Sequence, residues 1–378
     1  MKHIDTAERR ARLAARHFPA DTSAEAITSS LVALHSTDPA SVYLSVIGRG
    51  GTETGLEAAL YEQRSLVRMA GMRRTLFVVP AGDVPVLQAS TTSAIAAKER
   101  KGLTQFIVDG GFTAQWLAEV EGGTLAALRE TSDVTASELG DRVPGLKEQI
   151  PVAVGKPYET KQGVSTRLMY TLSAEGKVVR GRPRGSWLSG QYRWSLAEPI
   201  AEVPVAEAQA AWVRRWLEVF GPGTEADIKW WTGWTLTAVR KALGALGAEQ
   251  VGLDGGTVGY VLPGDTEPAP GPKRAAVLPA LDPTPMGWQE RGWYLDPAHK
   301  AELFDRTGNI GPTIWWGGEI VGGWAQRGDG EVAYRLLATV DKAAVKAIEA
   351  ELGRVGAWLA GHRVTPRFRT PLERELSA

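Results

Sequence analysis

Cysteine is absent from the 378 residues of the chain, and histidine is rare, with five residues. Without cysteine, disulfides and thiolate metal sites are excluded. The histidines show no spacing typical of metal ligands, so we expect no structural zinc and no metal or organic cofactor. No apolar run of about eighteen residues occurs, and the first residues lack the apolar core of a signal peptide. These absences predict a soluble protein of the bacterial cytoplasm that does not enter a membrane.

An excess of charge of either sign is also missing, because 43 Lys and Arg residues balance 43 Asp and Glu residues. A protein that coats DNA without specificity would be strongly basic, so the balance argues against that class. The basic residues nevertheless cluster in three segments: Arg64, Arg68, Arg73 and Arg74; Lys98, Arg100 and Lys101; and Arg180, Arg182, Arg184 and Arg193. This clustering suggests one basic face that can bind phosphates.

Two stretches, residues 135–194 and 224–262, repeat one order of elements: a capped helix, a second helix and a two-stranded hairpin. Thr135 and Glu138 have the spacing of a capping box, and Thr224 opens the second stretch in a similar way. A helix pair followed by a hairpin is the winged form of the helix-turn-helix, which binds DNA through a helix and a wing. The repetition therefore predicts at least two DNA-binding modules.

The N-terminal part predicts a third, less regular unit of the same kind. Helices are expected at residues 5–16, 23–34, 39–46 and 56–62, followed by a tight hairpin at residues 66–79. Residues 89–120 predict a long, mostly helical connection. A further helix at residues 205–220 should end at Gly221 and Pro222.

The proline-rich residues 263–272 mark the clearest boundary in the chain. Beyond it, strands are expected at residues 275–279, 313–324 and 331–337, and a helix capped by Asp341 at residues 343–359. We therefore expect an α+β fold, with tandem winged helix-turn-helix units followed by a C-terminal β-barrel-like domain, or a sheet, with one covering helix. The expected domains are residues 1–120 (first unit with its helical connection), 121–203 (second unit), 204–266 (third unit) and 273–378 (C-terminal domain).

Polar side chains gather at the corner between two predicted helices, at residues 34–39. Judged by residue type alone, Asp38 is a helix N-cap, Pro39 the first helical residue, and Ser36 and Thr37 ordinary turn residues. His35 is then a histidine whose hydrogen bonds are satisfied at a helix end. Residue types by themselves favour this structural interpretation over a catalytic one.

Four segments, residues 34–39, 72–80, 221–233 and 278–283, resemble the AlkZ/YcaQ-like winged-helix DNA glycosylases, and the likeness extends over nearly the full length. The resemblance implies three tandem winged-helix units and a C-terminal β-barrel. It also implies the excision of alkylated bases, including bulky adducts and crosslinks. In some members of this family, excision protects antibiotic producers from their own genotoxins.

The catalytic signature of that family is glutamine, an aliphatic residue, and then glutamine or aspartate, usually followed by an acidic residue and proline. In this chain His35 and Thr37 occupy the two polar positions, Ser36 the aliphatic position, and Asp38 with Pro39 the trailing pair. All three core positions thus differ from the commonest pattern.

The resemblance implies that His35, Thr37 and Asp38 are the catalytic residues. Breaking an N-glycosidic bond builds positive charge on the sugar, and a nearby carboxylate lowers that barrier. We therefore expect Asp38 to stabilise charge or activate water and His35 to position the water. Thr37 is expected to form a hydrogen bond to the water or to the sugar–phosphate. An alkylated purine is positively charged and leaves without strong general-acid help.

The expected DNA contacts are basic residues: Arg73, Arg74, Arg180, Arg182, Arg184, Arg193 and Lys229. We expect Arg180, Arg182 and Arg184 at an exposed hairpin tip, where glycines let the backbone approach a groove. Arg73 and Arg74 should alternate on a strand, so that at most one faces the core. Beside Lys229, packing of Trp230 and Trp231 is the simpler interpretation, and core packing should explain most of the 14 tryptophans.

The sequence thus predicts a monomeric, monofunctional DNA glycosylase that hydrolyses the N-glycosidic bond of alkylated purines in damaged double-stranded DNA. The main alternative is a non-enzymatic DNA-binding protein or transcriptional regulator. The helices at residues 164–174 and 235–246 offer few of the Arg, Asn and Gln side chains that base reading needs, which favours repair. A sugar- or peptide-active enzyme has little support, because no carboxylate pair or nucleophile–base motif stands out.

Overall fold

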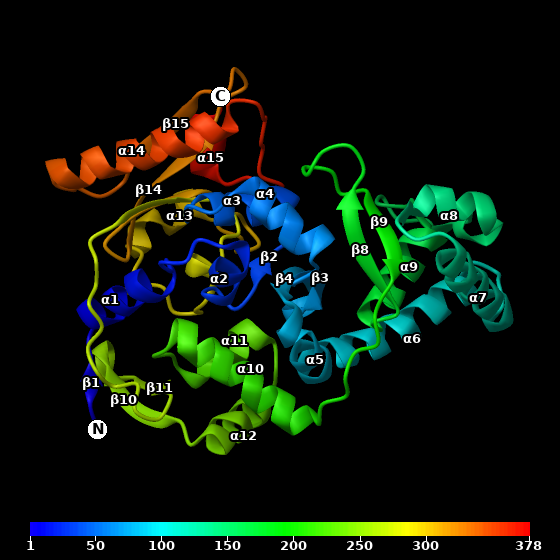
Figure 1. Cartoon of the computed structure of the whole chain (residues 1–378), viewed down its shortest axis with the longest axis horizontal. Helices are drawn as coiled ribbons and strands as arrows, with labels where there is room; N and C mark the ends of the chain where they lie inside the picture. The colour runs from blue at the N-terminus through cyan, green and yellow to red at the C-terminus, as the bar shows by residue number, and fades with distance from the viewer.

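The computed structural model describes residues 1–378 and has a mixed α+β fold. Figure 1 shows two parts: a lobe built from residues 93–196 and a main body formed by the rest of the chain. Three segments share one order of elements, in which a helix is followed by a short strand, two more helices and a hairpin. In each segment the short strand or a single bridge pairs with the second strand of the hairpin. No helix is long and apolar enough to cross a membrane.

The first segment follows β1 (His3–Ile4) and α1 (Thr6–Arg16) in the main body. It consists of α2 (Ala24–Ser29), β2 (Leu34–His35), α3 (Pro39–Ile47), α4 (Glu53–Glu57) with the π-helical turn Ala58–Glu62, β3 (Leu66–Gly71) and β4 (Thr75–Pro80). Strands β2, β4 and β3 form an antiparallel sheet in that order. The predicted hairpin is confirmed, but α2 ends earlier than expected because Val32 takes a left-handed φ of 63°.

The second segment forms the lobe, which α5 (Val84–Leu87), a π-helical turn and α6 (Ser93–Asp109) join to the first. Its elements are α7 (Ala114–Glu130), β5 (Val134–Thr135), α8 (Ala136–Arg142), the hairpin β6 (Gln149–Val152) and β7 (Thr160–Gly163), α9 (Val164–Ala174), β8 (Val178–Pro183) and β9 (Tyr192–Leu196). The expected capping box of Thr135 and Glu138 starts α8, and the helical connection is confirmed with a break between α6 and α7.

The third segment returns to the main body. It consists of α10 (Val205–Phe220), α11 (Glu225–Thr232), α12 (Leu236–Leu246), β10 (Glu249–Leu253) and β11 (Val258–Val261). Gly223 bridges Tyr260 in the place of the short strand, and β1 adds to β10 in parallel. Helix α10 ends at Gly221 as predicted, and Thr224 caps α11 in a capping box.

The C-terminal part contains an open antiparallel sheet and no closed barrel, so of the two expected alternatives the sheet is the one found. Its elements are β12 (Ala275–Leu278), α13 (Lys300–Leu303), β13 (Thr313–Trp316), β14 (Glu319–Gln326), β15 (Val332–Leu336), α14 (Lys342–Leu359) and α15 (Pro371–Leu376). The order β12-β13-β14-β15 leaves β12 and β15 at opposite edges. Residues of β12 alternate between two cores, so both faces of the sheet are covered, and α14 covers one as expected.

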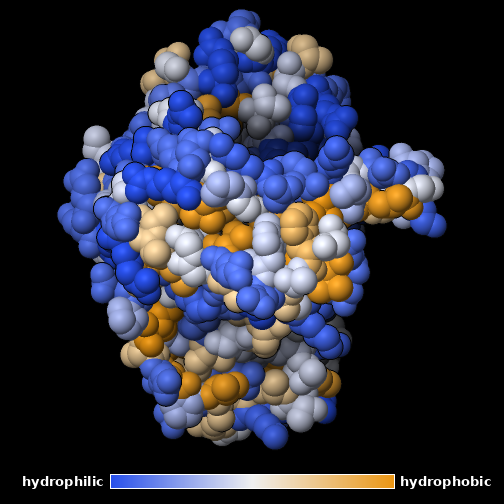
Figure 2. Space-filling model, turned by 90° about the vertical axis from the view of Figure 1, so that its right-hand side faces the viewer, coloured by the Kyte–Doolittle hydropathy of each residue, from blue (hydrophilic) through white to orange (hydrophobic).

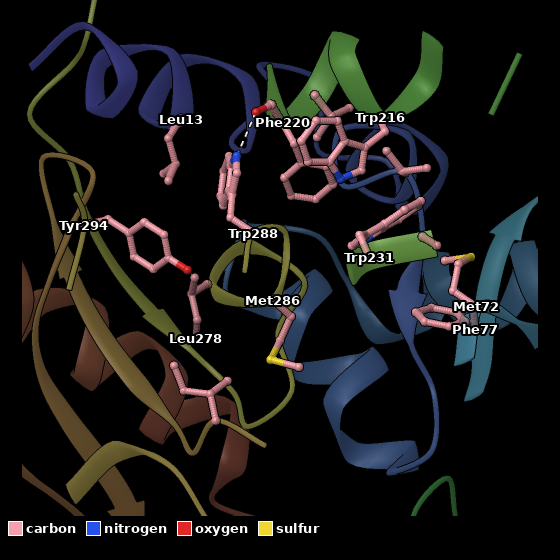
Figure 3. Close-up of a cluster of buried hydrophobic side chains, with 14 of the residues drawn as sticks. Leu13, Met72, Phe77, Trp216, Phe220, Trp231, Leu278, Met286, Trp288 and Tyr294 are labelled. Carbon is pink, nitrogen blue, oxygen red and sulfur yellow. Dashed lines mark hydrogen bonds between the residues drawn. The ribbon is translucent and has the colours of Figure 1, made fainter. Parts of the chain in front are cut away.

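The hydrophobic cores divide the chain differently from the three segments. A cluster of 35 buried residues joins α10–α12, the first hairpin and one face of the C-terminal sheet, and a cluster of 25 joins α2–α4 to the other face. Figure 3 shows the first cluster, in which the Trp288 Nε1 donates to the Phe220 carbonyl at 3.0 Å. Most tryptophans are buried, as predicted. The 17 residues of a third cluster lie wholly within residues 103–194, so the lobe has a core of its own.

Candidate functional site

The corner between β2 and α3 is held by Asp38. One oxygen of its carboxylate, Oδ1, accepts the Ala40 N–H at 3.1 Å, and Pro39 is the first helical residue. This confirms the N-cap interpretation. The second oxygen, Oδ2, accepts the Arg367 N–H at 2.9 Å, and the Arg367 guanidinium donates to the Thr37 carbonyl at 3.3 Å. Asp38 therefore ties the corner to the C-terminal segment as well as capping α3.

The ring of His35 lies beneath the corner rather than at its surface. It packs edge-on against Phe77, with 5.4 Å between ring centroids. Burial and the nearby charge of Arg73 lower the pKa of His35 to about 3, so the imidazole is neutral near neutral pH. The expectation of a histidine with satisfied hydrogen bonds is wrong, because the buried Nδ1 has no hydrogen-bond partner. The Nδ1 is therefore a buried polar atom whose hydrogen-bonding capacity the protein leaves unused.

Ser36 and Thr37 line a cleft of about 590 Å³ between the main body and the lobe. The other lining side chains are rich in hydroxyls, and three are arginines: Pro39, Leu76, Thr135, Ala136, Ser137, Ser165, Thr166, Met169, Tyr170, Arg180, Arg184, Gly190, Gln191, Tyr192, Trp194 and Arg367. None of them is a carboxylate. The cleft thus offers cations and neutral donors, which suits an anionic ligand. Figure 2, viewed from the side of the lobe, shows hydrophilic side chains gathered on the upper part of this face, around a hollow.

The structure does not place the arginines of the second hairpin together at its tip. Arg180 is buried under the hairpin, where its guanidinium lies 4.6 Å from the Trp194 ring. Arg182 forms ion pairs with Glu57 and Glu62 of the main body. Only Arg184 is exposed and lines the cleft without an ion pair, while Arg193 donates to the Asp133 carbonyl at 2.8 Å. The prediction of an exposed Arg180 is wrong, because hydrophobic neighbours and Ser173 surround it.

Arg73 and Arg74 do not alternate on a strand as predicted, because both lie in the turn between β3 and β4. Their φ angles, 55° and 61°, are left-handed. The Arg73 guanidinium stacks at 4.3 Å over Trp230, and Arg74 pairs with Glu99 at 2.7 Å. Lys229 is exposed on α11, and its neighbours Trp230 and Trp231 pack against the main core, which confirms the packing interpretation.

Asp282 lies in residues 278–283, one of the four segments that carry the family resemblance, and it does more than form a turn. It is fully buried and accepts the Arg49 Nη1 and Nη2 at 2.8 Å each, the Ser45 Oγ at 2.7 Å and the Thr284 N–H at 3.0 Å. Burial alone would raise the pKa of Asp282, but Arg49 and these hydrogen bonds hold it below its ordinary value. Since Ser45 lies in the last turn of α3 and Arg49 follows directly after its C-cap, the pair fixes that helix against the C-terminal part.

A second cationic hollow of about 1040 Å³ adjoins the first through Arg367. Its charged lining residues are Lys300, Asp305, Arg306, Arg367, Arg369 and Arg374. The Asp305 carboxylate accepts hydrogen bonds from backbone N–H groups of its own loop, and Arg369 forms an ion pair with Glu373 at 2.7 Å. Sequence reasoning missed Arg367, because its partners Thr37 and Asp38 lie about 330 positions away in the chain. No group of three or more His, Asp or Glu side chains is arranged to hold a metal ion.

Comparisons with known proteins identify the family of the chain and a solved structure of similar fold. The family model described as "DNA glycosylase AlkZ-like" matches residues 28–358. The fold is similar to that of the Streptomyces sahachiroi DNA glycosylase AlkZ, with a TM-score of 0.69 and 18% sequence identity over 94% of this chain and 98% of that one. A search of curated proteins found no match. The chain therefore belongs to the AlkZ-like family of DNA glycosylases, hydrolases that act on glycosyl bonds in DNA repair.

Proposed function

We propose that this glycosylase excises alkylated purines from damaged double-stranded DNA. It acts as a monofunctional enzyme and a monomer, in the cytoplasm and without a cofactor. The observation that carries the proposal is that the signature corner opens through Ser36 and Thr37 onto a cleft lined by three arginines and no carboxylate. The cleft's 590 Å³ leaves room for bulky genotoxin adducts. Removal of such adducts would give an antibiotic producer resistance to its own product.

The three repeated segments are proposed to be winged-helix units, with the hairpins β3–β4, β8–β9 and β10–β11 as wings. This proposal is supported by the pairing of the short strand with the second hairpin strand in the first two segments and by the Gly223–Tyr260 bridge in the third. The domains are then residues 1–120, 121–203, 204–266 and 273–378. Two of the wings, β3–β4 and β8–β9, meet at the cleft.

Water attacks the anomeric carbon of the sugar while the cationic purine leaves with the bonding electrons as a neutral base. The added water loses one proton to the solvent, which leaves a hydroxyl on the sugar of the abasic site. Thr37 is half-buried on the cleft wall, where its hydroxyl can bind the water or the sugar–phosphate. His35 is proposed to position the water through its unpartnered Nδ1. A neutral imidazole with a pKa of about 3 cannot serve as a general acid near neutral pH.

Asp38 is proposed to stabilise the positive charge that develops on the sugar. Both of its oxygens already accept backbone N–H bonds, from Ala40 and from Arg367. Charge stabilisation is favoured over removal of a proton from water, because Asp38 does not itself line the cleft where that water would lie. The role is electrostatic and requires only that the carboxylate stays charged beside the cleft.

The DNA contacts proposed from the sequence are Arg73, Arg74, Arg180, Arg182, Arg184, Arg193 and Lys229. Among them Arg184 has the strongest support, because it lines the cleft without an ion pair. Arg367 joins the set, since it links the cleft to the second cationic hollow and so marks a route for the DNA backbone. The first turn of α9 adds Ser165 and Thr166 to the cleft, and its N-cap Gly163 leaves backbone N–H groups for a phosphate.

Formation of abasic sites tests the proposal on duplexes that carry N7-alkylguanine, N3-alkyladenine or a bulky adduct. Wild-type protein should release the base, and Asp38→Asn should lower the single-turnover rate by about 10²–10³-fold, since asparagine keeps the cap but removes the charge. His35→Ala tests the water site. Asp341→Asn, the same change at the N-cap of α14, is the control and should keep full activity. Unchanged excision by both Asp38→Asn and His35→Ala would refute the assigned roles.

A further inference from the structure

Two arginines are deeply buried where the lobe meets the main body. Arg68 on β3 is 2% exposed, and Arg180 on β8 is 8% exposed. The two strands are in contact, so that these side chains approach each other across the boundary. A buried cation is costly unless an anion compensates it, and its surroundings therefore indicate what it is there to bind.

Two of the three other buried arginines hold carboxylates, while Arg9 lies over the Trp293 ring at 4.1 Å and forms no ion pair. Arg12 pairs with Glu8 and with Asp265, both at 2.9 Å, and Arg49 pairs with Asp282 at 2.8 Å. The charges of Arg12 and Arg49 are thus neutralised by carboxylates of the protein itself.

Arg68 and Arg180 have no carboxylate within 4.0 Å. Arg68 donates to the Ser36 Oγ at 2.6 Å and to the Tyr61 hydroxyl at 3.3 Å, and stacks at 4.7 Å on Tyr192. Arg180 donates to the Ser173 Oγ at 2.8 Å. Burial lowers the pKa of Arg180 to about 10, and the charge of Arg68 acts in the same direction. Two like charges thus lie near each other with neutral partners only.

Cavities lie on both sides of this pair. Arg180 lines the cleft, and both arginines line a second cavity of about 340 Å³ behind it. The second cavity also contains Arg64, which forms no ion pair, together with Arg182 and Arg193, which face the acids Glu62 and Asp133. An anion bound between the two cavities would supply the counter-charge that the pair lacks.

We infer that Arg68 and Arg180 form a phosphate-binding site that holds the phosphodiester next to the target nucleotide in DNA, an inference that rests on the proposed function. A guanidinium offers planar donors that match phosphate oxygens. Ser36 joins this site to the signature corner, because its Oγ accepts from Arg68 and its own hydroxyl proton stays free to donate into the cleft. A phosphate anchored there fixes its sugar beside Thr37, so both arginines are positioning residues.

A neutral linkage tests this site. Duplexes carry 7-methylguanine with one methylphosphonate placed immediately 5′ or 3′ of the lesion. For wild-type protein, one of these placements should slow excision roughly tenfold or more. In Arg68→Gln and Arg180→Gln, excision is slower on the natural duplex, and the same methylphosphonate should cause little further loss. Arg142→Gln changes an exposed arginine on α8 that lines neither cavity, and should stay as sensitive as wild type.

Arg68→Lys keeps the charge and should retain part of the sensitivity, which guards against a folding defect in Arg68→Gln. The phosphate site would be overturned if neither methylphosphonate slowed excision, or if the glutamine variants were slowed as much as wild type. In either case the proposed glycosylase activity would stand. Affinity for a duplex with an uncleavable abasic analogue gives a second readout that needs no excision. If excision is absent but the neutral linkage weakens wild-type binding and not Arg68→Gln binding, the site stands and the proposed function falls. Thermal stabilisation by inorganic phosphate, with no linkage effect on DNA, would assign the pair to a small anion instead and refute the inference.

Discussion

Replacing Asp282 with asparagine should lower the free energy of unfolding by about 3–5 kcal/mol, because it leaves Arg49 buried without a counter-charge. Both side chains of the pair are 0% exposed, so water cannot compensate the lost charge. The carboxylate accepts four hydrogen bonds, two of them from Arg49. Asparagine would turn an NH₂ group, a donor, toward donors that now face an oxygen, so the loss includes repulsion as well as missing attraction.

Urea unfolding followed by tryptophan fluorescence measures this loss, since most buried tryptophans lie in the main body that the pair holds together. Glu331→Gln is the matched control: it breaks an exposed pair with Arg327, and the expected loss is about 1 kcal/mol at most. The double variant Arg49→Met with Asp282→Leu should recover much of the stability, because no unpaired charge remains. A loss for Asp282→Asn no larger than that of the control would refute the reasoning.

Burial and neighbouring arginines lower the pKa of His17 and His35 to about 3, whereas unfolded histidine titrates near about 6.5. The unfolded state thus binds more protons below that value, so stability should fall as the pH drops from about 6.5 toward 3. Urea midpoints across that range should show the slope, and His35→Asn should reduce it; equal midpoints at pH 7 and 5 would contradict the prediction. In salt titrations of duplex binding, Arg184→Ala should reduce the slope of log K against log salt by about 0.9, the value of one phosphate contact. Arg182→Ala should change it less, because Glu57 and Glu62 already neutralise that side chain, and the reverse ranking would count against the structure-based assignment.

Local signals explain what the sequence predicted well. The caps at Thr135, Asp38 and Asp341 depend on residues within four positions, and all three begin helices as expected. The recurring helix–hairpin order is similarly a matter of short-range pattern. The resemblance then supplied the family, which composition and periodicity could not.

Long-range packing explains the failures. Arg180 was expected at an exposed tip because arginine is usually solvated, yet it points inward on β8 just before a bulge in the pairing with β9. The sequence left a barrel and a sheet open as alternatives, because closure depends on whether β12 and β15 meet. In the structure they do not, and helices cover both faces of the open sheet. The partners Arg49 and Asp282 are separated by 233 positions, so no local pattern could reveal them.

The separate core of the lobe has a consequence for substrate range. The two walls of the cleft belong to parts with separate cores, joined by α6, residues 197–204 and contacts such as Arg182 with Glu57 and Gln88 with the Ala174 carbonyl. The loop of the β8–β9 hairpin also places Trp187 in the core of the main body, stacked on Tyr43 at 4.7 Å. The width of the cleft is therefore set by these joints rather than by the residues proposed to do the chemistry. Changes at these joints would alter which lesions fit the cleft, while the proposed catalytic corner stayed the same.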